Sequence, residues 1–208
     1  IRLHARGGLV GAYQLFGADP DVMAWLSFRV QSLTGYFRGI REGLTAELGR
    51  TVKLGCGPRS AAFAPLCGYD FEQLAQFMDF LMPKHYFFHR GFDGFIGTVH
   101  RYSETLCEWN PSLSVAESLS VVEALFGIVL PGVEEMVDFE SALSPEFFEQ
   151  VVTLETKRAL AAVDDPERIV PWLDTGRFPH DGDPMSARDL QMLLDTAVDN
   201  LATGLGAG

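Results

Sequence analysis

Three stretches of the sequence place residues that could do chemistry directly after short apolar runs. Residues 168–183 read RIVPWLDTGRFPHDGD, residues 51–59 read TVKLGCGPR, and residues 84–94 read KHYFFHRGFDG. Each apolar run stops at charged, aromatic or glycine residues, which is typical of a buried parallel strand that delivers its C-terminal end to a functional loop. We therefore predict that these three strand ends carry the function.

The stretch 168–183 combines an indole with carboxylates. Trp172 and Asp174 would lie at the rim of a sheet, and His180 would follow in the loop. A carboxylate beside an indole suits a sugar, because the ring stacks on C–H faces while the carboxylate accepts hydrogen bonds from hydroxyls. The alternative is a helix-capping loop whose acids are solvated. We predict Asp174 as a catalytic carboxylate, Trp172 as a stacking ring and His180 as a sugar contact.

Residues 84–94 place histidine, tyrosine and arginine close together along one strand. By alternation His85 and His89 share one face of this strand, whereas Tyr86 and Arg90 share the other. Packing by hydrogen-bonded histidines is the simpler interpretation of the first pair. We predict His85, Tyr86 and Arg90 as substrate contacts, without deciding which face carries the function.

Arg59 ends the stretch 51–59 and would donate hydrogen bonds to a substrate or clamp a carboxylate. A surface arginine paired with a nearby acid is an equal alternative, because the chain holds 16 Lys and Arg against 28 Asp and Glu, with a formal net charge of −12. That charge repels phosphate backbones and anionic surfaces, so we expect no nucleic-acid partner. Apolar runs fall short of the roughly 20 residues that a membrane span needs.

Helical patterns separate the three stretches. Apolar residues recur at three- and four-residue steps over 19–49, which predicts one long amphipathic helix with Trp25 and Phe28 widening its buried face. Shorter helices are predicted over 71–81, 98–108, 114–130, 145–163 and 186–200. Alternating strands and helices favour parallel βα units, and the absence of GxGxxG and P-loop motifs argues against a nucleotide-binding sheet. We predict an α/β fold, a partial (β/α)8 TIM barrel, with residues 1–208 as a single domain truncated at both ends.

Three segments together resemble a known family. These segments read WLSFRVQSLTGYFRGIREGL, GYDFEQLAQFMDFLMPKHYFFHRGFDG and IVPWLDTG. They resemble glycoside hydrolases with a TIM-barrel catalytic domain. The resemblance implies cleavage of a glycosidic bond by two carboxylates. It places Asp174 near the second carboxylate position, with the partner carboxylate upstream of residue 1.

Two rival functions stay open. One is a noncatalytic barrel that binds carbohydrate or serves as a scaffold, and the other is a metal-dependent barrel hydrolase using His85, His89 and His180. No familiar metal-ligand spacing is present, so we expect neither a metal nor another cofactor. The three cysteines form no CxxC pair and suit free thiols. A cytoplasmic location is favoured on this ground, and secretion stays open because the chain starts at Ile1.

Overall fold

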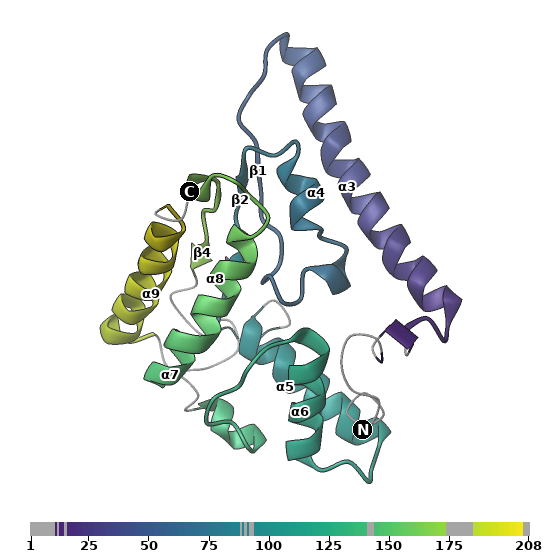
Figure 1. Cartoon of the computed structure of the whole chain (residues 1–208), viewed down its shortest axis with the longest axis vertical. Helices are drawn as coiled ribbons and strands as arrows, with labels where there is room; N and C mark the ends of the chain where they lie inside the picture. Colours follow the sequence, from purple (N-terminus) through teal and green to yellow (C-terminus); the bar gives the residue numbers. More distant parts are fainter. Residues whose placement is uncertain are drawn as a thin grey trace.

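The computed structural model describes residues 11, 13–14, 16–87, 89, 91, 94–140, 144–173 and 185–205. In Figure 1 the long helix α3 runs along one side, the short strands lie near the middle, and α9 lies on the other side. The main helices are α3 (Pro20–Leu48), α4 (Phe71–Ala75), α5 (Phe95–Trp109), α6 (Val115–Phe126), α7 (Pro145–Phe147), α8 (Thr153–Leu160) and α9 (Ala187–Leu205). Short 3-10 turns are η1 (Pro65–Cys67), η2 (Met136–Glu140) and η4 (Pro166–Arg168), and η3 (Phe148–Val152) is a π-helical segment between α7 and α8.

The fold is mostly helical, and the predicted α/β fold of a partial TIM barrel is wrong. Within the described residues the strands form only two sheets of two strands each, β1 with β2 and β3 with β4. The strands are β1 (Gly55–Cys56), β2 (Phe80–Leu81), β3 (Lys84–His85) and β4 (Trp172–Leu173). Parallel pairing between successive units is present, but the pairs are short and do not build the barrel that the alternation of elements suggested.

The two sheets share a middle segment, residues 80–85. This segment pairs with β1 on one side and with residues 169–173 on the other, always in parallel. The registered pairs are Gly55 with Phe80, Cys56 with Leu81, Leu81 with Ile169, Lys84 with Trp172, and His85 with Leu173. All three segments therefore run in the same direction, although β1 ends level with Leu81, four residues before the ends of β3 and β4.

Pro83 divides the middle segment into β2 and β3. Its carbonyl accepts the Trp172 N–H at 2.9 Å, and the Leu81 carbonyl accepts the Val170 N–H at 2.9 Å. Proline has no N–H to donate in return, so the ladder toward residues 169–173 lacks one bond. The middle segment consequently consists of two short strands.

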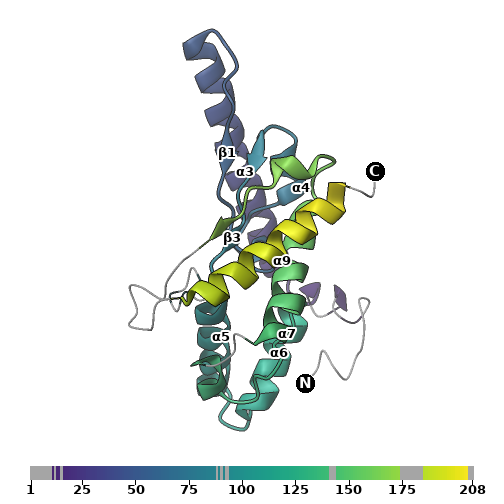
Figure 2. The same ribbon diagram turned by 90° about the vertical axis from the view of Figure 1, so that its left-hand side faces the viewer.

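One face of the strands is covered by helices. Cys56, Leu81 and Ile169 point to this side and pack with Ala159 of α8 and Leu74 of α4. Figure 2 shows α8 and α9 beside the strands, and Leu201 of α9 packs against the same cluster. This packing explains why alternate residues of the strands are apolar and buried.

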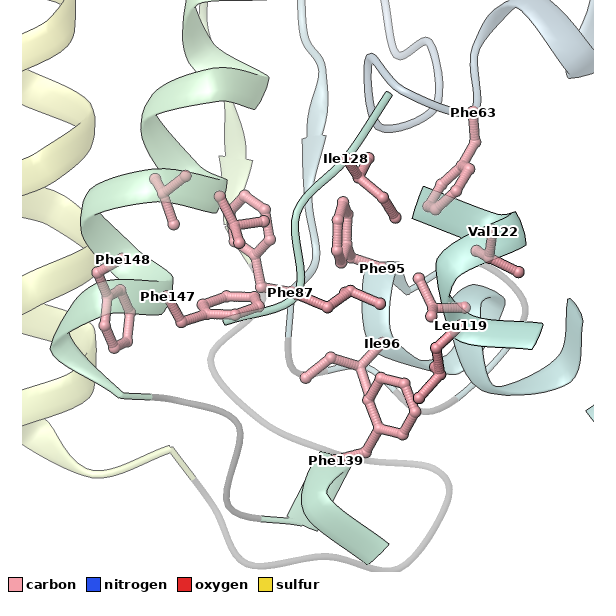
Figure 3. Close-up of a cluster of buried hydrophobic side chains, with 14 of the residues drawn as sticks. Phe63, Phe87, Phe95, Ile96, Leu119, Val122, Ile128, Phe139, Phe147 and Phe148 are labelled. Carbon is pink, nitrogen blue, oxygen red and sulfur yellow. The ribbon is translucent and has the colours of Figure 1, made fainter. Parts of the chain in front are cut away.

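The larger core lies beyond the strand ends and is rich in phenylalanine (Figure 3). Phe87 occupies its centre, with its ring centroid 5.7 Å from that of Phe95 and 5.8 Å from that of Phe147. Phe63 joins through Phe95, at 5.4 Å between ring centroids. These rings connect α5, α7 and the loop after β1, so the core holds that loop in place.

Helix α3 follows the predicted boundaries. Asp19 caps its N-terminus by accepting the Asp21 N–H at 3.0 Å, and Gly49 ends it with a φ of 61°, which glycine adopts without strain. The predicted burial of Trp25 and Phe28 is wrong, because both side chains are exposed. The periodicity of apolar residues located the helix, but the rest of the protein buries a narrower face of it than predicted. None of the helices in the described ranges is both long and apolar enough to cross a membrane.

The predicted helix over residues 71–81 ends at Ala75, earlier than expected. Arg168 donates to the carbonyls of Ala75, Met78 and Asp79, with the bond to Met78 at 2.8 Å. Arg168 supplies these carbonyls with the hydrogen-bond donors that further helical turns would otherwise provide. The helix can therefore end at Ala75, and the chain continues into β2. The contact spans about ninety residues of sequence, so the local pattern alone did not show it.

Candidate functional site

The predicted strand ends lie at one edge because the strands pair in parallel. Gly57 follows β1, Tyr86 follows β3, and Leu173 ends β4. Phe95, the first residue of α5, donates its N–H to the Tyr86 carbonyl at 2.8 Å and brings that helix to the same edge. The edge is thus a meeting point of three chain segments that lie far apart in sequence.

Opposite the covered side, the strands present a second face that no helix of the described residues covers. Its residues are Lys53, Gly55, Gly57, Phe80, Met82, Lys84, Tyr86, Val170 and Trp172, and we call it the uncovered face. These residues alternate with the buried ones along each strand. Parallel sheets are normally covered on both faces, so an open face of this kind is available for a ligand or a partner.

Trp172 dominates the uncovered face and is 45% exposed. Its ring atoms lie 3.5 and 3.7 Å from the position that a Cβ on Gly57 would take. The ring therefore reaches from β4 across the middle segment to β1. The absence of a side chain at Gly57 gives the indole its place, whereas the Met82 side chain lies over Gly55, with its Cε 3.1 Å from the position that a Cβ there would take.

Basic and aromatic groups surround Trp172. Lys84 is its partner in register, and the Lys84 Nζ lies 5.5 Å from the centroid of the Tyr86 ring. Lys53 lies at the other end of the face, 5.4 Å from the Phe80 ring centroid. Ammonium groups over rings gain from the ring quadrupole and keep their donors near the surface.

Arg59 lies at the rim, next to the start of α5. Its Nη2 donates to the Thr98 hydroxyl at 3.4 Å, and that hydroxyl donates to the Gly94 carbonyl at 2.7 Å. The guanidinium is thus oriented by the first turn of the helix. Of the predicted contacts, Tyr86 lies on the uncovered face with Trp172, whereas the Arg59 guanidinium is directed to Thr98 of α5.

His85 lies on the covered side, unlike Tyr86. It is 1% exposed, and its Nε2 is 3.0 Å from the Thr156 hydroxyl of α8. The same hydroxyl donates to the Val152 carbonyl at 2.8 Å, so α8 holds the imidazole on the covered side. Burial lowers the pKa of His85 to about 4, so the ring is neutral near pH 7. The predicted contacts His85 and Tyr86 therefore face opposite ways.

Three predicted site residues fall outside the described residues. These are Asp174, the predicted catalytic carboxylate, and His180 and Arg90, the predicted sugar contacts. The first of them follows Leu173 directly in sequence.

Two residues with evident roles were missed by the sequence analysis. Lys84 shares the uncovered face with Tyr86, and the same alternation that paired Tyr86 with Arg90 would have found it. Glu155 of α8 is 3% exposed and accepts the Ala62 N–H with both oxygens, at 3.1 and 3.2 Å, while Arg158 donates to it at 3.1 Å. It anchors the loop that follows Arg59. The helical spacing around it predicts an inward side chain, although a carboxylate at such a position is unusual.

An apolar groove of about 610 Å³ lies between α3 and the body. Its lining includes Leu26 and Val30 of α3, Leu66 of η1, Tyr102 of α5 and Phe126 of α6. No residue of the uncovered face contributes to it. Because its lining is mostly apolar and includes residues of α3, we interpret the groove as part of the contact between α3 and the rest of the protein, and not as a site for a polar ligand.

Within the described part of the chain, no group of three or more His, Cys, Asp or Glu side chains is placed to hold a metal ion. Of the histidines in the metal-dependent alternative, His85 contacts Thr156, and His89 accepts the Gly91 N–H on Nδ1 at 3.0 Å. His180 is outside the described residues. The geometry therefore gives that alternative no support.

Comparison with models of known protein families, with curated proteins and with solved structures finds no match to this chain. The resemblance to glycoside hydrolases accordingly stays a prediction carried by the quoted residues. The functional assignment rests on the geometry of the uncovered face.

Proposed function

We propose that this protein binds carbohydrate on the uncovered face. The observation that carries the proposal is Trp172, which is 45% exposed on a strand, next to Gly57 and in register with Lys84. An indole that packing does not bury offers a flat apolar surface to the C–H face of a sugar ring.

The neighbouring groups fit the polar part of a sugar. Lys84 supplies N–H donors for hydroxyl or carboxylate oxygens, and Tyr86 adds a second ring with a hydroxyl that both donates and accepts. Stacking and hydrogen bonding are thereby available side by side, as in sites that combine an apolar surface with a few polar groups.

Binding is tested by replacing Trp172 with alanine. We expect the variant to lose about tenfold or more in affinity, because a stacking ring is removed from the centre of the contact. Titration calorimetry against neutral, amino and uronate oligosaccharides measures the affinity. The matched control is Trp109→Ala, which removes another exposed indole at the end of α5, away from the strands. Equal affinities for the wild type and Trp172→Ala, or no binding in the whole panel, would refute the proposal.

Hydrolysis is a second candidate, which the place of Asp174 in the sequence suggests. Glycosidases need two carboxylates around the scissile bond, and the residues of the uncovered face include none. Asp174 comes directly after Leu173, which ends β4 at the edge beside Trp172. We propose it as one of the two carboxylates.

Asp174→Asn separates binding from hydrolysis. If the carboxylate is catalytic, the variant loses turnover of aryl glycosides by at least about a hundredfold while oligosaccharide affinity is kept, since general acid or base catalysis contributes factors of this size. Release of the aryl group measures turnover, and calorimetry measures binding. Unchanged turnover would exclude Asp174 from catalysis, and carbohydrate binding without any turnover by the wild type would leave binding as the function.

A further inference from the structure

The outer face of α3 is exposed along nearly its whole length. Within the 29-residue helix, Thr34 is the sole residue that the structure buries. Three large aromatic side chains point to solvent, with Trp25 49%, Phe28 66% and Tyr36 64% exposed. A group of exposed aromatic side chains on one helix is typical of an interaction surface.

The same face carries a run of glycines. Gly35, Gly39 and Gly43 are spaced by four residues, and a Cβ on any of them would meet nothing within 4 Å. Each glycine in a helix interior costs about 1 kcal/mol relative to alanine. Packing within the described part of the chain does not require these glycines, so contact with something outside that part would explain them.

Bulky and small residues are separated along this face. Successive residues of an α-helix are 100° apart, which places Trp25 and Phe28 on the same side as the glycines. Trp25 and Phe28 occupy the N-terminal part, Tyr36 lies near the middle, and the small residues Ser32, Gly35, Gly39, Gly43 and Ala46 extend to the C-terminal part. When two copies of such a helix lie antiparallel, the large side chains of each copy meet the small residues of the other.

We propose that α3 pairs antiparallel with α3 of a second copy of this chain, about a two-fold axis between Gly35 and Tyr36. The opposed residues are then Trp25 with Ala46, Phe28 with Gly43, Ser32 with Gly39, and Tyr36 with Gly35. Every large ring faces a small residue of the other copy, which lets the helices approach closely. An isologous contact of this kind closes after two copies.

The charges at the helix ends agree with this arrangement. Asp19 and Asp21 lie at the N-terminus, and Arg50 follows the C-terminal cap. Antiparallel pairing brings the acidic end of one copy beside Arg50 of the other, where opposite charges attract. The macrodipoles of the two helices also oppose each other.

Sedimentation equilibrium of the 208-residue protein tests the pairing. We expect a monomer–dimer equilibrium whose dissociation constant rises at least about tenfold in Gly39→Leu, because a side chain in the hollow separates the helices. The open space at Gly39 lets leucine fit the isolated fold, so the melting temperature of the monomer should not fall. Ser120→Leu, an exposed position on α6, is the matched control and should leave dimerisation unchanged. A protein that stays monomeric at high concentration, or a dimer that Gly39→Leu leaves intact, would overturn the proposal.

Orientation is tested by cross-linking. In the proposed dimer Ser32→Cys of one copy faces Gly39→Cys of the other, within the Cα separation of about 7 Å that a disulfide tolerates. The double variant should therefore form a covalent dimer on mild oxidation, whereas Gly39→Cys alone should not. Efficient cross-linking by Gly39→Cys alone would show parallel helices and refute the antiparallel arrangement.

Discussion

Replacing Phe87 with alanine is expected to lower the free energy of unfolding by about 3 to 5 kcal/mol, the usual range for removing a buried phenylalanine ring. Phe87 is fully buried at the end of the middle segment, between Phe95 of α5 and Phe147 of α7. Its removal leaves a cavity that rings on three sides cannot close without moving their helices. The loss should exceed that of any exposed apolar residue.

Urea denaturation followed by circular dichroism measures this effect. The matched control is Val137→Ala in η2, whose side chain is 65% exposed and whose loss should change stability by no more than about 0.5 kcal/mol. Comparable losses in the two variants would mean that Phe87 is not at the centre of the core. A loss confined to Phe87→Ala supports the core in Figure 3.

Replacing Glu155 with alanine is expected to cost about 3 kcal/mol, because it breaks a buried charged contact and leaves both partners without it. The Ala62 N–H loses its acceptor, and Arg158 loses its carboxylate. Glu155→Gln retains an oxygen for the Ala62 N–H and should lose much less. Thermal denaturation at neutral pH compares the two variants. Equal losses of thermal stability in Glu155→Gln and Glu155→Ala would mean that the hydrogen bond to Ala62 does not hold the loop after Arg59.

The stability of the folded protein also depends on whether the Glu155 carboxyl is protonated. Burial raises the pKa of Glu155 above its ordinary value. The folded protein then keeps a proton that the unfolded chain releases, so the stabilisation is complete below the ordinary pKa and is lost as the pH rises through the raised one. Stability of Glu155→Gln relative to the wild type should therefore increase over this window. Melting curves between about pH 4 and pH 8 measure it, and parallel profiles for the two proteins would contradict the raised pKa.

Local patterns predicted the helices well but did not predict how the strands assemble. The spacing of apolar residues located α3, and α6 starts where its helix was predicted, with Ser114 as the N-cap and Glu117 completing a capping box. Both signals arise within a few turns of one helix. Whether short strands close into a barrel depends on pairing between distant segments, and Gly55 or Trp172 alone does not reveal the number of partners a strand has.

The same limit applies to the candidate site. Alternation showed that His85 and Tyr86 must face opposite ways, but not which of them is covered. The contact of His85 with Thr156, 71 residues away, decides this. Likewise the apolar residues of α3 outnumber those that the body covers, so periodicity extended the buried face to Trp25 when the body does not reach it.

Pro83 makes it easier for residues 169–173 to separate locally from the middle segment. Residues 169–173 receive one bond fewer from the middle segment than a regular ladder would supply, so separating them costs less than the global free energy of unfolding. Trp172 is carried on this segment. A ligand that stacks on the indole would bind the closed form only, and its affinity would include the work of ordering this segment. Amide protons of Val170 and Trp172 would then exchange with solvent more slowly in the complex than in the free protein.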